Sequence, residues 1–310
     1  MSENRNAYIA AIIYAFVIGL SFMFVKVTLT VASPIDILAH RFTFAFIGIV
    51  IIMVMTKNKL IMNMQDILKI LPLAILYPIA FFTFQVLGLA KISSSEAGII
   101  QATIPIFTLA LAGLLLKEKA TRGQLVSVSL SVLGVIYLLM MNGANTTTGN
   151  VIGSGFILLS AIATSLYNIF ARGLTKKYSL LALTYVMTLC GFVIFNGMAL
   201  GSHMMNGTLN EFFKPLTHAH FVFAILYLGI LSSLGTSYLS NYALSKLEAS
   251  KMSVFSNFAT LITILAGVLF LQEDFHLYHL IGGIMIIIGV IGTNYFGGKC
   301  RTSEIMNRNI

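Results

Sequence analysis

Apolar residues are arranged in ten long runs that are separated by short polar stretches. The runs cover residues 7–30, 35–56, 67–90, 95–116, 123–141, 151–171, 180–201, 219–245, 252–271 and 276–297. Each has about the length that an α-helix needs to cross the hydrocarbon core of a bilayer, which is ~20 residues. The pattern therefore predicts an all-α membrane protein with ten transmembrane helices. Pro72 and Pro78 lie inside the third run and predict a kink in that helix.

The composition agrees with lipid as the main solvent of the folded chain. Of its 310 residues, 58% are hydrophobic and 9% are charged, whereas a soluble domain has about 25% charged residues. Ten crossings leave only short connections, so we expect no separate soluble domain. The first run has no small-residue cleavage site close after it, which favours a retained helix over a removed signal peptide.

The basic residues indicate how the helices are oriented. If the N-terminus is cytoplasmic, fifteen of the nineteen lysines and arginines fall in cytoplasmic segments, and only Lys91 and Lys214 fall in outer loops. Loops rich in Lys and Arg stay on the cytoplasmic side of a cell membrane. This bias predicts an even number of crossings with both termini in the cytoplasm. The net charge of +9 then belongs to these loops and does not indicate nucleic-acid binding.

The second half of the chain weakly repeats the first. At a shift of 155 residues several residues coincide: Lys91 with Lys246, Ser95 with Ser250, Thr108 with Thr263 and Glu118 with Glu273. Because a unit of five helices crosses the membrane an odd number of times, its repeat must be inverted. We therefore expect two inverted five-helix repeats, residues 1–145 and 146–310. Inverted repeats are typical of secondary transporters, whose substrate site lies between the repeats near the middle of the membrane.

Short motifs in both halves resemble those of a known transporter family. They are Gly19-Leu-Ser-Phe followed by Lys26, His40-Arg41-Phe42, Ser95-Glu96-Ala97, Pro105, Leu116-Lys117-Glu118, Ala249-Ser250 and Leu271-Gln272-Glu273. By their order and spacing over nearly the whole chain, the sequence resembles the EamA-type transporters of the drug/metabolite transporter superfamily. The resemblance implies ten helices in two five-helix units, and export or exchange of small metabolites. The chain departs from the family pattern at Ile18, where a tryptophan is usual, and at Thr260, where a proline is expected, so the resemblance does not identify the substrate.

Two cations and two carboxylates near the predicted outer side are candidates for a gate. A charged side chain in hydrocarbon costs at least about 2.5–3.5 kcal/mol, so Lys26 and Arg41 need a reason to be there. Lys26 is either a gate or substrate anchor, or a lysine whose amine reaches the interface. Arg41 is expected to form a structural ion pair or a headgroup contact, with Asp36 and Glu96 as the available carboxylates. For Glu96, a capping box with Ser93 and a gating pair with Lys26 both remain open.

The middle of the predicted membrane region holds uncharged polar side chains. Those that we expect to bind the solute are Ser21, Tyr77, Gln101, Tyr167, Asn168, Tyr238, Asn241 and Asn257. Hydrogen-bonding groups beside aromatic rings suit a small polar or zwitterionic solute. The alternative is that these side chains bond their own backbone or a neighbouring helix. The lack of a carboxylate at this depth gives no support to proton antiport.

Small residues recur along the fifth and tenth predicted helices. They are Gly123, Ser127 and Ser131 in the fifth and Gly282, Gly289 and Gly292 in the tenth. Such residues allow helices to approach closely, so we expect internal packing, with a homodimer contact as the alternative. Glu118 and Glu273 end helices at opposite membrane faces, and we expect them to pin interhelical turns.

Neither a metal nor a cofactor is expected. His218 with His220, and His276 with His279, lack nearby cysteines or converging carboxylates, so they are interpreted as interfacial histidines. The isolated thiols of Cys190 and Cys300 form no disulfide framework. No nucleotide-binding motif is present, so an ATP-driven pump would need a separate subunit.

The function favoured by these observations is a secondary transporter of the plasma membrane. It would move a small metabolite by alternating access, with efflux of an amino acid or related compound as the first hypothesis. Within carriers, a sugar, nucleotide-sugar or drug transporter is an alternative. A membrane-embedded enzyme acting on lipid or isoprenoid substrates needs clustered acids or histidines at membrane depth, and a receptor or scaffold would show no substrate-dependent flux.

Overall fold

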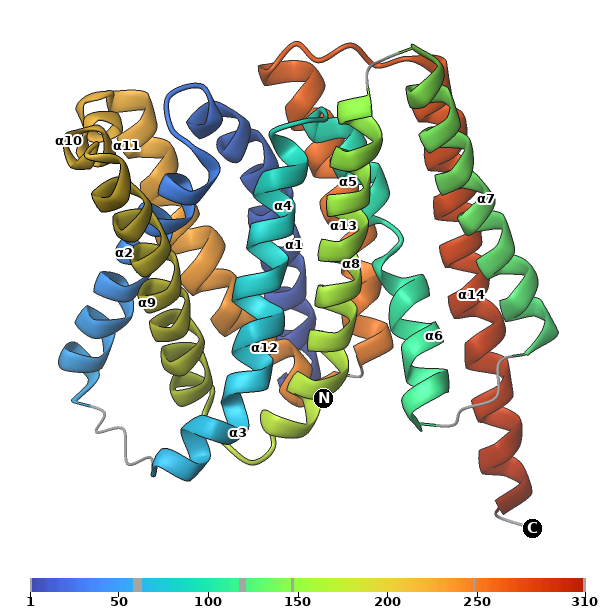
Figure 1. The fold of residues 1–310 in the computed structure, drawn as a ribbon. Coiled ribbons are helices and arrows are strands. Elements are labelled where there is room, and N and C mark those ends of the chain that lie inside the picture. The colour runs from blue at the N-terminus through green and yellow to red at the C-terminus, as the bar shows by residue number, and fades with distance from the viewer. Residues whose placement is uncertain (1, 58–62, 117–120, 146–147, 248, 309–310) are drawn as a thin grey trace.

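The computed structural model describes residues 2–57, 63–116, 121–145, 148–247 and 249–308, in which every regular element is a helix (Figure 1). The side chains of some residues inside these ranges, Asn257 among them, are not described. In chain order the elements are α1 (Ser2–Leu29), α2 (Pro34–Thr56), α3 (Met64–Ala74), η1 (Ile75–Ala80), α4 (Phe81–Leu89), α5 (Ser94–Gln101), α6 (Ile104–Leu116), α7 (Arg122–Asn145), α8 (Thr148–Leu174), α9 (Leu180–Asn206), α10 (Leu209–Phe213), η2 (Lys214–Thr217), α11 (Ala219–Leu226), η3 (Tyr227–Gly235), α12 (Thr236–Lys246), α13 (Ala249–Phe270) and α14 (Leu277–Arg308).

Several of these helical segments have the length and apolar composition of membrane spans. In the described ranges seven do: Arg5–Leu29, Pro34–Thr56, Met64–Leu89, Ser94–Leu115, Asn150–Leu174, Leu180–Asn206 and Ala219–Lys246. The chain is therefore a multi-pass membrane protein. The other three predicted spans correspond to shorter apolar stretches within α7, α13 and α14, at Arg122–Leu138, Phe258–Phe270 and Leu277–Gly289, so the count of ten crossings stays a prediction.

Serine caps define where three of the helices begin. Ser33, Ser93 and Ser179 each have extended backbone, and each side-chain oxygen accepts a hydrogen bond from the backbone N–H three residues later. This bond satisfies one of the N–H groups that a helix start leaves without an intrahelical partner. It fixes the turns from which α2, α5 and α9 start.

Three of the apolar segments are not straight helices, and one of them, Ser94–Leu115, is interrupted between α5 and α6. The prolines in the third run have the predicted effect, because the helix breaks into α3, η1 and α4 and Tyr77 leaves helical geometry with φ −144° and ψ 113°. The segment Ala219–Lys246 contains the π-helical stretch η3 between α11 and α12. Such irregular backbone inside a membrane segment is tolerated where neighbouring protein satisfies the freed polar groups.

Helix α1 lies in the middle of the bundle, and α7 and α14 form an outlying pair at one side (Figure 1). Helix α1 packs against α13 and α12, while α8 packs against α4, α5 and α6. Helices α2 and α9 form a second long contact. We call the end that carries the turns 30–33 and 90–93, which is at the top of Figure 1, the upper end of the bundle.

The small residues of α7 and α14 face each other, which agrees with the expected packing within the chain. A Cβ atom added to Gly289 would lie 2.0 Å from Ser131 Oγ and 2.5 Å from the carbonyl oxygen of Ser127. The hydroxyl of Ser131 donates to the carbonyl of Ile286 on the facing helix at 3.0 Å. This face is therefore used for packing within the chain.

Candidate functional site

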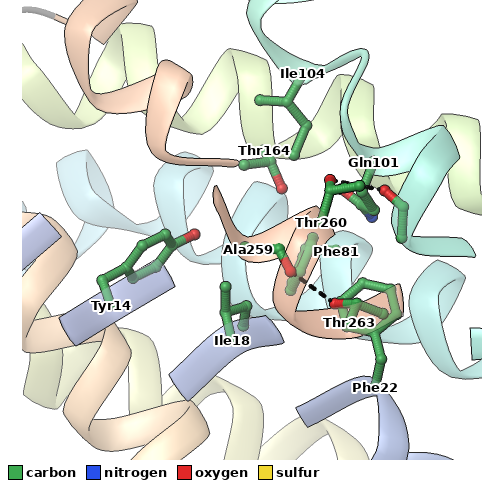
Figure 2. A pocket seen from close by; sticks show the side chains of 11 residues that line it. Tyr14, Ile18, Phe22, Phe81, Gln101, Ile104, Thr164, Ala259, Thr260 and Thr263 are labelled. Carbon is green, nitrogen blue, oxygen red and sulfur yellow. Dashed lines mark hydrogen bonds between the residues drawn. The ribbon is translucent and has the colours of Figure 1, made fainter. Parts of the chain in front are cut away.

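A small buried pocket lies where α1, α4, α5, α6, α8 and α13 meet. Eleven residues line it: Tyr14, Ile18, Phe22, Phe81, Gly98, Gln101, Ile104, Thr164, Ala259, Thr260 and Thr263 (Figure 2). Its volume is about 20 Å³, which is enough for about one water molecule. The structure therefore shows this site in a closed form, with no room for a metabolite.

The helix break between α5 and α6 shapes one wall of the pocket. Pro105 has no N–H with which to bond the carbonyl of Gln101, so the helix that ends at Gln101 restarts at Ile104. The hydroxyl of Thr103 donates to the carbonyl of Ile100 at 2.7 Å, and that of Ser165 on α8 donates to the carbonyl of Ile104 at 3.0 Å. The break places the Gln101 amide at the pocket, bonded to the hydroxyl of Ser160.

Two threonines of α13 line the pocket next to α5. Thr260 donates to the carbonyl of Gly98 at 2.9 Å, and Thr263 donates to the carbonyl of Gly19 at 2.9 Å. These bonds need close backbone approach, because a Cβ on Gly19 would lie 2.7 Å from the carbonyl oxygen of Ala259. Helix α13 is thereby joined directly to both α5 and α1 beside the pocket.

Two further hydroxyl groups, one from α1 and one from α8, face the pocket. The hydroxyls of Tyr14 and Thr164 point toward the same space (Figure 2). Within the described structure the fully buried hydroxyl of Thr164 has no hydrogen-bond partner. A buried hydroxyl without a partner is costly, so a solute or water that bonds it would be stabilised here. Tyr14, Thr164 and Thr263 were not among the predicted site residues, although Thr164 lies one helical turn from Asn168.

A cluster of tyrosines and an asparagine adjoins the pocket. The ring centroids of Tyr77 and Tyr167 are 4.9 Å apart. The hydroxyl of Tyr77 is 3.2 Å from Thr236 Oγ1, and the hydroxyl of Tyr167 donates to Asn241 Oδ1 at 2.8 Å. Tyr77, Tyr167 and Asn241 are thus brought together from η1, α8 and α12, while their expected role in binding a solute stays a prediction.

The remaining predicted solute-binding residues are placed differently. Ser21 donates to the carbonyl of Ile18 on its own helix at 2.6 Å, which was the alternative weighed for it. Asn168 is buried on α8 but does not line the pocket. Tyr238 is 42% exposed, on the outside of α12. The side chain of Asn257 lies outside the described residues.

Arg41 is fully buried and is held by neutral groups. Its Nε donates to Ser233 Oγ at 2.6 Å, its Nη2 donates to Ser232 Oγ at 2.8 Å, and its guanidinium lies 3.8 Å from the centroid of the Phe82 ring. The expected headgroup contact is excluded by this burial. The expected carboxylate is also absent among the described residues, because Asp36 instead bonds His203 Nε2 at 3.0 Å.

Two carboxylates, those of Glu273 and Glu96, form hydrogen bonds between helices at the upper end of the bundle. Both oxygens of Glu273 accept bonds from the N-terminus of α5, at 2.6 Å from Ser94 N and 2.9 Å from Ser95 N. The Ser95 hydroxyl adds a bond of 2.7 Å. A carboxylate at this position also interacts favourably with the helix dipole. Glu273 therefore pins an interhelical turn, as predicted, whereas its counterpart Glu118 lies outside the described residues.

Glu96 and Lys26 belong to the same region. The backbone N–H of Glu96 bonds the Ser93 cap at 3.1 Å, and its carboxylate accepts a bond of 2.7 Å from Ser154 on α8. Lys26 is half-buried and interacts electrostatically with Glu273 and Glu96, but no direct salt bridge of Lys26 occurs among the described residues. Cap and gate are therefore compatible roles for Glu96.

The charge on Glu273 is stabilised where it lies. Burial alone would raise the pKa of this carboxyl, but hydrogen bonds from the side chain and backbone of Ser95 and from Ser94 outweigh that effect and hold it below the usual glutamate range. Glu273 is therefore a permanent anion at neutral pH.

Comparison with known proteins shows similarity over the whole chain. A profile described as the EamA-like transporter family matches twice, at residues 5–140 and 151–295. The chain is 50% identical over 292 residues to the uncharacterized transporter YcxC of Bacillus subtilis, covering 94% of each protein. It is 28% identical over 274 residues to an uncharacterized transporter of Archaeoglobus fulgidus, covering 88% of this chain and 92% of the relative.

One solved structure, described only as a crystal structure of a protein, has a similar fold. Its TM-score is 0.63 at 15% sequence identity, and the match covers 94% of this chain and 96% of that one. At this identity the likeness concerns the fold alone.

Proposed function

Because the chain belongs to the EamA-like transporter family, we propose that it is a secondary carrier that moves a small metabolite across the plasma membrane by alternating access. Efflux of an amino acid or related compound is the first form of this proposal. The observation that carries it is the buried pocket, which combines a few polar groups with aromatic rings where interrupted helices meet.

Two inverted five-helix repeats, residues 1–145 and 146–310, are part of the proposal. The family profile matches once in each unit. Ser33 and Ser179 cap α2 and α9 in the same way, and these two helices pack together. The contact of α1 with α13 has a counterpart in that of α8 with α5 and α6, as an exchange of the two repeats requires. These regularities support ten crossings.

The orientation proposed from the basic residues puts the upper end outside the cell. With the N- and C-termini in the cytoplasm, the turns 30–33 and 90–93 and the segment that holds Glu273 face outward. The hydrogen bonds that Glu273 accepts from α5, and that Glu96 accepts from Ser154, then close the outer side of the pocket. Opening the outer side requires α5 to separate from these groups, which is the motion that alternating access needs.

The proposed solute site consists of Gln101, Tyr77, Tyr167 and Asn241, to which the structure adds Tyr14 and Thr164. These side chains surround or adjoin the pocket and offer hydrogen-bond donors, acceptors and aromatic faces. The bonds to Ser160 and among the cluster are satisfied in the closed form. A solute would exchange them for its own, which keeps the cost of desolvation low.

Flux through purified protein in liposomes tests the proposal. Vesicles loaded with a mixture of radiolabelled amino acids should lose at least one of them faster, and saturably, when they contain the protein. Gln101→Ala should reduce that flux at least tenfold, because the amide is replaced by a methyl group at the pocket wall. Gln65→Ala, at an exposed position of α3, is the matched control and should transport normally. Saturable flux unchanged by Gln101→Ala would refute the site.

A further inference from the structure

The guanidinium of Arg41 is a buried charge without a counter-ion among the described residues. Its hydrogen-bond partners are the hydroxyls of Ser232 and Ser233 on η3 and the carbonyl of Ser232 at 3.4 Å. All of these groups are neutral, as is the ring of Phe82 beneath it. Arginine stays protonated in proteins, so the burial of this charge is compensated only in part.

A donor of Arg41 is left without a partner. Arg41 Nη1 is buried and has no hydrogen-bond partner in the described structure, and the same is true of the amide nitrogen and the amide oxygen of Gln85 on α4. Gln85 lies one turn of α4 away from Phe82. The fork of N–H groups on a guanidinium matches the two oxygens of a carboxylate. An acceptor with a negative charge is what this arrangement lacks.

The acidic side chains at the upper end of the bundle have other partners. Asp36 accepts bonds from Ser33 at 2.8 Å and pairs with His203. Glu96 accepts the hydroxyl of Ser154, and Glu273 caps α5. Since Arg41 is 0% exposed, a lipid headgroup does not reach it either. An anion at Arg41 would therefore have to come through the protein interior.

A single layer of aromatic rings separates Arg41 from the pocket. Phe81 lines the pocket, and its ring centroid is 4.7 Å from that of Phe82 and 5.0 Å from that of Tyr77. The guanidinium of Arg41 lies over the ring of Phe82, 3.8 Å from its centroid. The layer begins where Tyr77 leaves helical geometry, and the serines that hold Arg41 lie on π-helical backbone. Both η1 and η3 are therefore irregular helical segments, in which the backbone can change conformation without moving the rest of the bundle.

We propose that Arg41 receives the carboxylate of the transported solute once the pocket opens and the Phe81–Phe82 layer moves aside. This inference rests on the carrier function proposed above and names its substrate class. The solutes are organic acids or amino acids that carry a free carboxylate. Amines and uncharged sugars lack the group that would complete the Arg41 site.

Metabolite export by cells that overproduce the protein tests this assignment. Untargeted measurement of the medium should show that the compounds exported by the wild type all carry a carboxylate. Arg41→Gln should reduce their export at least tenfold. Arg122→Gln, the same replacement at an exposed position of α7, should export them like the wild type.

A matched pair of solutes sharpens the test in liposomes. For the acid exported most strongly, the wild-type protein should transport the acid at least tenfold faster than its primary amide, and Arg41→Gln should remove that preference. If Arg41→Gln fails to accumulate in the membrane, Arg41→Lys is measured instead. Lysine keeps the positive charge but lacks the paired N–H groups of a guanidinium. Arg41→Lys should therefore raise the KM for the acid at least fivefold.

The outcomes separate the two proposals. Export of neutral or cationic compounds by the wild type, or equal export of acids by Arg41→Gln, overturns the carboxylate site and leaves the carrier function standing. A wild-type KM in Arg41→Lys likewise overturns the site. If the wild type changes no metabolite and carries none in liposomes, the carrier function itself fails, and the inference fails with it.

Discussion

Single residues decide how tightly the upper end is closed. Glu273 reaches across from the segment between α13 and α14 to cap α5, although the two are distant in sequence. Bonds to a charged acceptor are about twice as strong as neutral ones. The Glu273 carboxylate is also the charge with which Lys26 interacts most strongly. One side chain therefore joins α13, α5 and α1 at the mouth of the pocket.

Removing the charge of Glu273 should open this end more often. In Glu273→Gln the bonds to Ser94 and Ser95 become neutral, at a loss of about 1.5 kcal/mol or more. A membrane-impermeant maleimide should then label Thr164→Cys at least about tenfold faster, in a background with Cys190→Ser and Cys300→Ser. Glu211→Gln, which loses only an exposed salt bridge with Lys214, should leave the rate unchanged. Equal rates in Glu273→Gln and its parent would contradict this role.

The closure should also depend on pH in one direction. Because the pKa of Glu273 lies below its usual value of 4.5 in the folded protein, the closure is fully present above that value and is lost as pH falls through the lowered pKa. Labelling of Thr164→Cys should be constant, after correction for thiol reactivity, from about pH 8 to about pH 5. A rise in labelling between pH 7 and pH 5 would show that another group controls the opening.

At the scale of elements, interrupted helices build the site and close-packed helices support it. The breaks at Tyr77, between α5 and α6, and along η3 all adjoin the pocket or the polar cluster next to it. The α7–α14 pair, in contrast, consists of long helices in contact through glycine and serine. Close packing of small residues is the main attraction between helices where no water is present.

The contact between α7 and α14 should tolerate no added methyl group. Gly289→Ala would place a Cβ 2.5 Å from the Ser127 carbonyl oxygen, so the helices must move apart, and we expect a fall in thermal unfolding temperature in detergent. Gly155→Ala is the matched change in α8, where nothing lies within 4 Å of the new atom. It should be neutral or stabilising, by up to about 1 kcal/mol. A Gly289→Ala protein as stable as Gly155→Ala would show that the pair is loosely packed.

At the scale of the whole molecule, the structure leaves little space at the pocket. The pocket has room for about one water, and its upper side is held by Glu273, Glu96 and their partners. A carrier must also adopt arrangements in which this side is open. The proposed orientation gives that motion a direction, because the upper end then faces the exterior.

Cysteine labelling in intact cells checks this orientation. In a background without Cys190 and Cys300, Lys214→Cys at the upper end should react with an impermeant maleimide added outside, because Lys214 is exposed. Lys57→Cys, at the other end of α2, should react only after the membrane is permeabilised. Outside labelling of Lys57→Cys in intact cells would reverse the proposed topology.

Parts of the site could be expected from the sequence, and parts could not. Tyr77, Tyr167 and Asn241 stood out because polar groups are costly in hydrocarbon, and that cost makes them bond one another. Arg41 stood out for the same reason, but its predicted carboxylate partner was wrong among the described residues, since two serines hold it instead. Thr164 could not be recognised from the sequence as a pocket residue, because the hydroxyl of a threonine on a membrane helix usually bonds its own backbone.

The sequence by itself determined the class of the protein, since run length, charge distribution and the family motifs each depend only on local composition and order. These features predicted a multi-pass helical transporter before any contact was known. Only the tertiary structure decided which helices meet at the pocket, that Glu273 caps α5, and that Arg41 is buried without a counter-ion. Such facts depend on contacts between residues up to about 190 positions apart, and in an apolar chain with few charges many pairings satisfy the same hydropathy pattern.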